Sequence, residues 1–82
     1  SVVSLTQDYV ALAYTLAELG FLYYHQNEYA EAEKRLKEAN KLFQFYYKQF
    51  VNGPSIMERI SETLNLINIK LPIRNIGRNV NR

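Results

Sequence analysis

The spacing of apolar residues constrains the fold of this chain more than any other feature of its sequence. Between residues 5 and 23, apolar side chains recur at steps of three and four residues, which is the period of one face of an α-helix. Ser4 and Gln7 have the S-x-x-Q form of a capping box, which is typical of a helix start. We therefore predict a helix over about residues 5–25. Its apolar face consists of Leu5, Tyr9, Leu12, Leu16, Leu19 and Tyr23.

A second stripe with the same period follows the polar break at residues 25–27. It predicts a helix over about residues 28–51. We expect Gly53, in a left-handed cap, and Pro54, which cannot continue a helix, to end this segment. The stripe consists of Tyr29, Ala32, Leu36, Ala39, Phe43, Tyr47 and Phe50.

A third helix is predicted over about residues 56–70. Ser55 and Glu58 have the form of a second capping box at its start. Pro72 disfavours helical backbone at the residue before it and therefore marks the end. The apolar face of this helix consists of Ile56, Ile60, Leu64, Ile67 and Leu71.

The length and composition of the chain fit one small domain. Eighty-two residues, 48% of them apolar, are enough for a single hydrophobic core. We predict an all-α, three-helix domain over residues 1–72, as a bundle or a solenoid fragment, followed by a basic, flexible tail over residues 73–82. The absence of cysteine excludes a disulfide scaffold, so we expect an intracellular, cytoplasmic protein. Because the chain begins at Ser1, we also expect it to be a piece of a longer protein.

The positive charge of the chain is concentrated at one end. The net charge is +2, yet Lys70 and the three arginines of the tail leave residues 1–69 with a net charge of −2. A compact basic face for nucleic acid is therefore not evident, and we expect a solvated tail. Contact of the tail with nucleic acid or an acidic membrane is the alternative. No apolar run approaches the roughly 20 residues that span a bilayer.

Gly20 lies within the first predicted helix, where glycine costs about 1 kcal/mol relative to alanine. Glycine at such a position indicates a close approach of two helices, because a side chain would push their axes apart. Ala32 and Ala39 are the small residues expected on the opposing helix. We therefore predict an antiparallel helical hairpin. The residues expected to fill the space beside the close contact are Leu16, Leu19, Tyr23, Tyr29 and Leu36.

The spacing Leu16-x2-Leu19-Gly20-x2-Tyr23, followed by Ala32-x3-Leu36, resembles the tetratricopeptide repeat (TPR) over about residues 13–46. Leu16 stands where that family has Trp, and Leu36 where it has Phe. The family's Pro after the second helix is absent, so we expect this helix to run about two turns longer than usual. A hairpin with an elongated second helix, closed by a third, also resembles the microtubule-interacting-and-trafficking (MIT) domain.

The first helix carries a second apolar stripe, roughly opposite Leu12 and Leu19. One interpretation is that the third helix covers this stripe as core. The resemblance implies another, in which the stripe lines the inner side of a repeat and holds a partner peptide by apolar and aromatic contact. Contact with a neighbouring repeat or an identical chain also stays open. The candidate partner-binding residues here are Tyr14, Ala17, Phe21, Tyr24 and His25.

The second predicted helix also carries more apolar residues than one face can hold. Phe45 lies about half a turn from Leu36 and Phe43, and with Leu42 and Tyr46 it would form an exposed patch. We therefore predict that Phe45 and Tyr46 contact another chain or a missing part of the same chain.

No residue pattern indicates catalysis, a metal or a cofactor. His25 is the sole histidine and has only weak oxygen ligands in Asn27 and Glu28 nearby, and no nucleophile is paired with it. We expect a non-enzymatic protein-interaction module that serves as a scaffold or peptide-docking domain, whose partner is a protein or peptide, helical or extended. An MIT-like adaptor, the structural end of a longer solenoid and a homo-oligomer are the alternatives.

Overall fold

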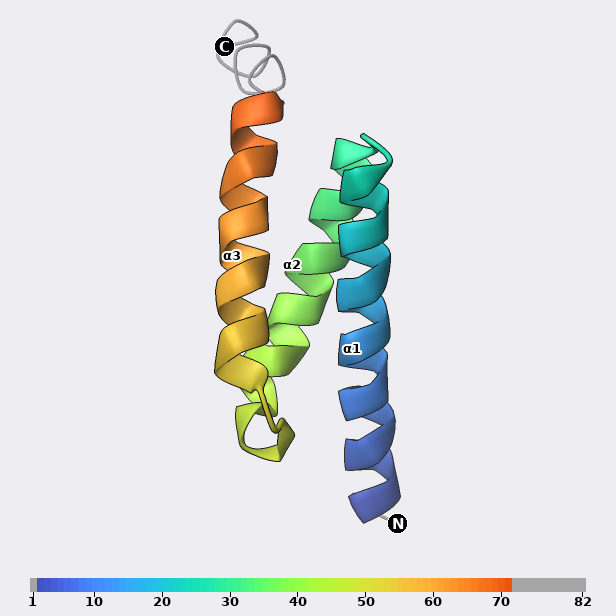
Figure 1. Ribbon diagram of the computed structural model, residues 1–82. Helices are drawn as coiled ribbons and strands as arrows, with labels where there is room; N and C mark the ends of the chain where they lie inside the picture. The colour runs from blue at the N-terminus through green and yellow to red at the C-terminus, as the bar shows by residue number, and fades with distance from the viewer. Residues whose placement is uncertain (1, 72–82) are drawn as a thin grey trace, which may run out of the picture.

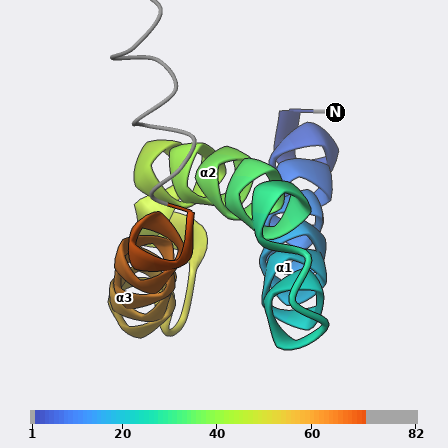
Figure 2. The same cartoon turned by 90° about the horizontal axis from the view of Figure 1, so that it is seen from above.

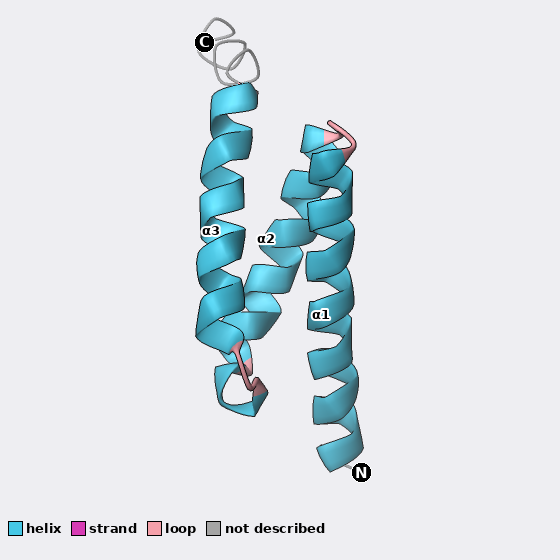
Figure 3. Cartoon of the chain, in the orientation of Figure 1, coloured by secondary structure: helices cyan, strands magenta, loops and turns pink. Residues whose placement is uncertain are grey.

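The computed structural model describes residues 2–71, which form three α-helices and one short 3-10 turn (Figure 1). Helix α1 spans Val2–His25, α2 spans Tyr29–Phe45, the 3-10 turn η1 spans Tyr47–Gln49, and α3 spans Gly53–Lys70. Over these residues the chain contains no strand (Figure 3). The predicted all-α, three-helix fold is confirmed. The tail predicted over residues 73–82 lies outside the described residues.

Helix α2 is the central element of the fold. It forms an antiparallel hairpin with α1, and α3 then runs back along the other side of α2. Viewed from above, α1 and α3 flank α2 and remain apart along most of their length (Figure 2). The three helices therefore form an open arrangement in which α2 makes most of the interhelical contacts.

The turn between α1 and α2 was predicted from its polar residues and is confirmed. Asn27 adopts a left-handed backbone conformation with φ of 66°, which asparagine tolerates better than most residues. The backbone N–H of Glu28 donates to the carbonyl of Tyr23 over 2.9 Å, and the Tyr29 hydroxyl donates to Asn27 Oδ1 over 2.8 Å. These bonds close the turn and begin α2 at Tyr29.

The prediction that the second helix continues to residue 51 is wrong. α2 ends at Phe45, and Tyr46 leaves the helical conformation while its N–H still donates to the carbonyl of Leu42. The η1 turn then directs Phe50 back into the core, where its ring lies 4.3 Å from that of Phe43, centroid to centroid. The chain therefore leaves the helix after Phe45, and the turn that follows allows Phe50 to be buried.

The start of α3 also differs from the expected capping box at Ser55. The helix begins at Gly53, with Asn52 as N-cap residue and Pro54 in the first turn, where proline is well tolerated. Gly53 does not have a positive φ, so the expected left-handed cap is wrong too. The Asn52 side chain makes no capping bond; its Oδ1 accepts a hydrogen bond from the Tyr14 hydroxyl over 3.2 Å.

The face of α1 that packs against α2 is rotated from the predicted one. Leu12 and Leu19 are 43% and 37% exposed, whereas Ala13, Ala17 and Gly20 are buried. A Cβ atom added at Gly20 would lie 2.5 Å from the Leu36 side chain, so the predicted close approach at this glycine is confirmed. The buried core consists of Ala13, Ala17, Ala32, Leu36, Ala39, Phe43, Phe50, Ile60 and Ile67.

Candidate functional site

The outer side of the α1–α2 hairpin carries an exposed apolar surface, which we call the outer strip. Its members come from the last turn of α2, from the residue after it, and from the side of α1 opposite Tyr14 and Phe21, which contact Asn52 and Arg59. Phe45 is 78% exposed, and Tyr9, Leu12 and Leu19 are each more than a third exposed. The outer strip consists of Tyr9, Leu12, Leu16, Leu19, Phe45 and Tyr46.

Aromatic contacts join the two helices along the outer strip. The Tyr9 and Tyr46 rings stack with their centroids 5.7 Å apart and an angle of 11° between their planes. The Phe45 ring meets the edge of Tyr46 at 4.7 Å. Leu12, Leu16 and Leu19 follow Tyr9 at steps of three and four residues, so they extend the same side of α1. The outer strip is therefore one continuous surface.

The structure places Tyr14 in an aromatic cluster inside the protein. Its ring packs edge-on against Phe43 at 5.5 Å and against Phe50 at 5.1 Å. Its hydroxyl donates to Asn52, immediately before α3. Tyr14 therefore connects α1 to the segment that leads into α3, and only part of the side chain remains accessible.

Ala17 and Phe21 occupy the same side of α1 as Tyr14. Ala17 is 3% exposed, which corrects the expectation that it offers surface to a partner. Phe21 is half-buried, and the Arg59 guanidinium of α3 lies 4.0 Å above its ring, a cation–π geometry. This pair is a direct contact between α1 and α3. The expectation that the third helix packs on this stripe is met only locally.

Tyr24 and His25 lie at the end of α1, beside the turn. The Tyr24 ring is 5.7 Å from His25 and 5.6 Å from Tyr29, both in edge-on geometry. His25 itself is exposed. The seven predicted site residues therefore fall into two groups, because only Phe45 and Tyr46 belong to the outer strip.

Sequence reasoning assigned Tyr9, Leu12 and Leu19 to packing and so missed them as surface residues. The signal that distinguishes the two sides of α1 is residue size. Ala13, Ala17 and Gly20 are spaced by four and three residues, as small residues at a close helix contact are. The leucines adjacent to that small stripe are turned toward solvent.

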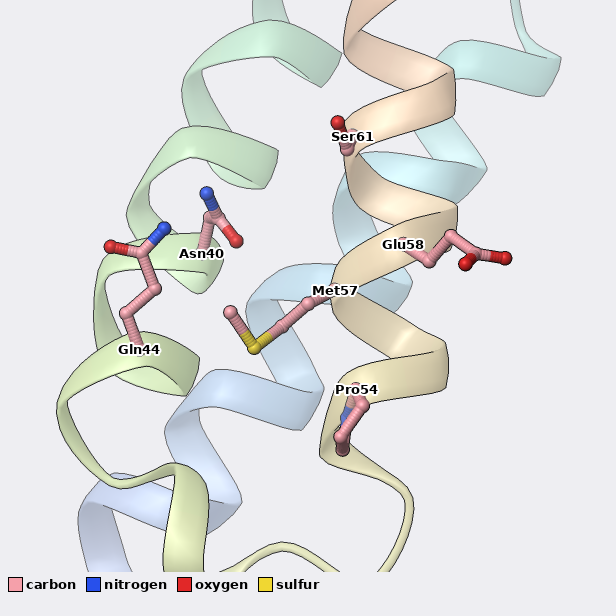
Figure 4. A pocket seen from close by; sticks show the side chains of 6 residues that line it. All are labelled: Asn40, Gln44, Pro54, Met57, Glu58 and Ser61. Atoms are coloured by element: carbon pink, nitrogen blue, oxygen red, sulfur yellow. The ribbon is translucent and has the colours of Figure 1, made fainter.

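A groove of about 580 Å³ lies between α2 and α3 (Figure 4). Met57 extends from α3 toward α2, where Asn40 and Gln44 project one helical turn apart. No pattern noted in the sequence pointed to this groove, because its walls come from two helices whose relative position the sequence does not state. Its lining residues are Asn40, Gln44, Pro54, Met57, Glu58 and Ser61.

The charged residues of α2 pair mainly with one another. Arg35 forms ion pairs with Glu31 at 3.4 Å and Glu38 at 3.7 Å, and Lys37 pairs with Glu33 at 3.6 Å. Pairs of this kind on a helix surface contribute only a few tenths of a kcal/mol each, roughly. By helical spacing the two sets lie on different flanks of α2, and Glu33 is itself buried.

Within residues 2–71, no three His, Cys, Asp or Glu side chains are grouped closely enough to hold a metal ion. Over the same residues, no helix combines the length and the apolar character that crossing a bilayer requires. Comparison of the chain with family models, with curated protein sequences and with solved structures gave no match.

Proposed function

We propose that this chain is a non-enzymatic protein-interaction module that docks a partner protein or peptide on the outer strip. The observation that carries the proposal is the contiguous apolar exposure that runs from Phe45 through Tyr46 and Tyr9 to Leu12 and Leu19. Large apolar patches on a small domain mark interaction surfaces, because their exposure to water is unfavourable.

The composition of the outer strip supports this use. Aromatic residues are enriched in the cores of protein interfaces, and tyrosine combines a large contact area with few rotatable bonds. The stacked Tyr9 and Tyr46 rings are already held in place by each other, so binding would cost them little conformational entropy. A partner helix with an apolar face, or an extended apolar strip, would fit such a surface.

The open arrangement of the helices favours one alternative in particular. The outer strip lies on the side of α1 opposite Phe21, which contacts α3, and this is where the preceding helix of a longer helical stack would pack. The chain would then be the structural end of a TPR-like solenoid. A closed, MIT-like adaptor is supported less well, because α1 and α3 make few contacts.

Substitution of the outer strip tests the proposal. The double variant Leu12→Ser, Phe45→Ser should retain its helical circular dichroism, because both side chains are substantially exposed. It should lose self-association in light scattering and lose binding of an apolar dye. Ile69→Ser is the matched control, since it removes an exposed apolar residue from α3.

Two results would contradict the proposal. A large loss of helix content in the double variant would mean that the outer strip belongs to the internal core. The second result is that the parent chain, the double variant and the control bind the dye equally and have the same oligomeric state. The outer strip would then not be an interaction surface.

A further inference from the structure

We propose that the partner of the outer strip is a second copy of this chain, and that the two copies pair with their α1 helices antiparallel. This inference rests on the proposed function, because it names the partner of the same surface. The contact is a two-fold dimer in which the outer side of each α1–α2 hairpin covers the other. The α1 and α2 helices of both copies then enclose the two outer strips as a four-helix bundle.

The exposed apolar residues of α1 follow the seven-residue repeat of a coiled coil. Tyr9, Leu12, Leu16 and Leu19 are separated by steps of three, four and three residues. Apolar residues that alternate in this way form a narrow seam, which a second helix covers with interlocking side chains. The small residues that pack on α2 lie on a neighbouring stripe of α1. One helix can therefore serve both contacts at once.

The seam is self-complementary when two copies of α1 run in opposite directions. With a two-fold axis at the level of residue 14, Tyr9 of one copy meets Leu19 of the other, and Leu12 meets Leu16. This level is close to the middle of α1, so the two copies overlap along almost the whole helix. Each tyrosine of the seam then packs against a leucine instead of a second tyrosine.

The same axis brings the two copies of α2 together near Leu42. Gly20 lies against Leu36, and Tyr9 stacks on Tyr46, so the level of the axis in α1 corresponds to Leu42 in α2. Leu42 is half-buried, and it lies one helical turn before Tyr46 on the outer side of α2. In the dimer it would contact the same leucine of the other copy.

The size of the outer side matches a second copy better than a single helix. Phe45 on α2 is 78% exposed, so a partner must cover both helices of the hairpin. Two helices are about 20 Å wide, and the overlap of α1 is about 33 Å long, which gives roughly 650 Å² per copy. The total reaches the lower end of stable interfaces, about 1,200 Å². A single helix would cover half of this width, and parallel α1 helices would place the two α2 helices on opposite sides.

The charges beside the contact are complementary in this arrangement. Lys48 is exposed and forms no ion pair within residues 2–71. The axis near Leu42 brings it opposite the ion-paired group on α2 of the other copy. That group consists of Glu31, Arg35 and Glu38, so its net charge is −1. The dimer therefore places a free cation beside an acidic group twice.

Light scattering coupled to size exclusion tests the dimer on the full 82-residue chain. We expect twice the 9.6 kDa mass of one chain. Leu12→Glu should raise the dissociation constant of the dimer about a hundredfold, because the contact would bury an unpaired carboxylate. It should retain its helical circular dichroism, because Leu12 is 43% exposed within one copy. Ala11→Glu adds the same charge at an exposed position of α1 outside the seam and should leave the constant unchanged.

Single cysteines report the direction of pairing, because the chain has none of its own. Tyr9→Cys and Leu19→Cys chains, mixed and treated with a short bis-maleimide, should be linked to each other. Neither variant should be linked to itself, since the axis separates the two copies of either residue by about 15 Å along α1. Linkage of either variant to itself would overturn the antiparallel pairing.

A monomeric parent chain would overturn this inference. If the Leu12→Ser, Phe45→Ser variant then still lost its dye binding, the proposed function would stand with a different partner; if dye binding were unchanged, both would fail. A dimer that Leu12→Glu and Ala11→Glu weaken equally would lie away from the outer strip and would overturn the inference as well.

Discussion

The two interhelical contacts of α2 differ in how closely the helices approach. Against α1, Gly20 brings the backbone so near that an added Cβ would lie 3.2 Å from the Leu36 backbone nitrogen as well as against its side chain. Against α3, the contact is made by the larger side chains of Ile60 and Ile67, and a groove of about 580 Å³ remains beside them. Residue size therefore decides which side of α2 is closed.

The difference has a functional meaning. A helix contact made by glycine and alanine leaves no room for larger side chains between the two helices. The larger apolar residues beside it must therefore face solvent or a partner. A contact built on isoleucine holds the helices farther apart, so polar side chains near its edge can stay without partners. We call the α1–α2 contact the closed contact and the α2–α3 contact the open contact. The outer strip lies beside the closed contact, and the groove lies beside the open contact.

The largest expected effect comes from filling the closed contact. Gly20→Leu would force α1 away from Leu36, at a cost of about 3 kcal/mol of the free energy of unfolding, because overpacked cores relax poorly. For a domain of this size, thermal denaturation followed by circular dichroism should show a loss of about 15 °C.

Ala11→Leu is the matched control for that experiment. It places the same leucine side chain at an exposed position of α1 and should leave the melting temperature almost unchanged. An unchanged melting temperature for Gly20→Leu would show that the close approach of α1 and α2 does not exist.

A smaller loss is expected when atoms are removed from the open contact. Ile60→Ala empties a fully buried position of α3, yet α3 has free space beside it and can shift to reduce the cavity. We expect a loss of about 2 kcal/mol, at the lower end for this substitution, measured by urea denaturation. Ile69→Ala, at an exposed position, should have little effect, and an equal loss for both variants would refute this difference in burial.

The smallest effect is expected when atoms are added to the open contact. Ser61→Leu places a larger side chain at the edge of the groove, where space is available. The free energy of unfolding, measured by urea denaturation, should change by less than about 0.5 kcal/mol. A loss of stability comparable to that of Gly20→Leu would mean that both contacts of α2 are closed.

The sequence was sufficient to predict the helices, the turn at residues 25–27 and the close contact at Gly20. These features depend on local chemistry, namely apolar period, polar turn residues and the absence of a side chain. The sequence did not show which of the two apolar sides of α1 is buried. Both sides have helical period. Leucines at this period usually mark a buried face, yet in this helix the small Ala13 and Ala17 are the buried residues.

The errors at the ends of α2 and α3 have a different origin. Helical period continues through Phe50, and nothing local indicates that its ring returns to meet Phe43 and Tyr14. Likewise, Asn52 would cap α3 on local grounds, but a tyrosine distant in sequence uses its side chain. The groove could not be predicted for the same reason, because it depends on where α3 lies relative to α2.

Helix α3 is held against the hairpin at both of its ends. Near its beginning, Asn52 and Arg59 contact Tyr14 and Phe21 of α1. Near its end, Ile67 is fully buried, and the Lys70 amine lies 5.6 Å from the centroid of the Tyr29 ring at the start of α2. Because both ends are held, α3 cannot rotate about Gly53 without breaking the contacts of its last turns, so Lys70 keeps its place against the hairpin.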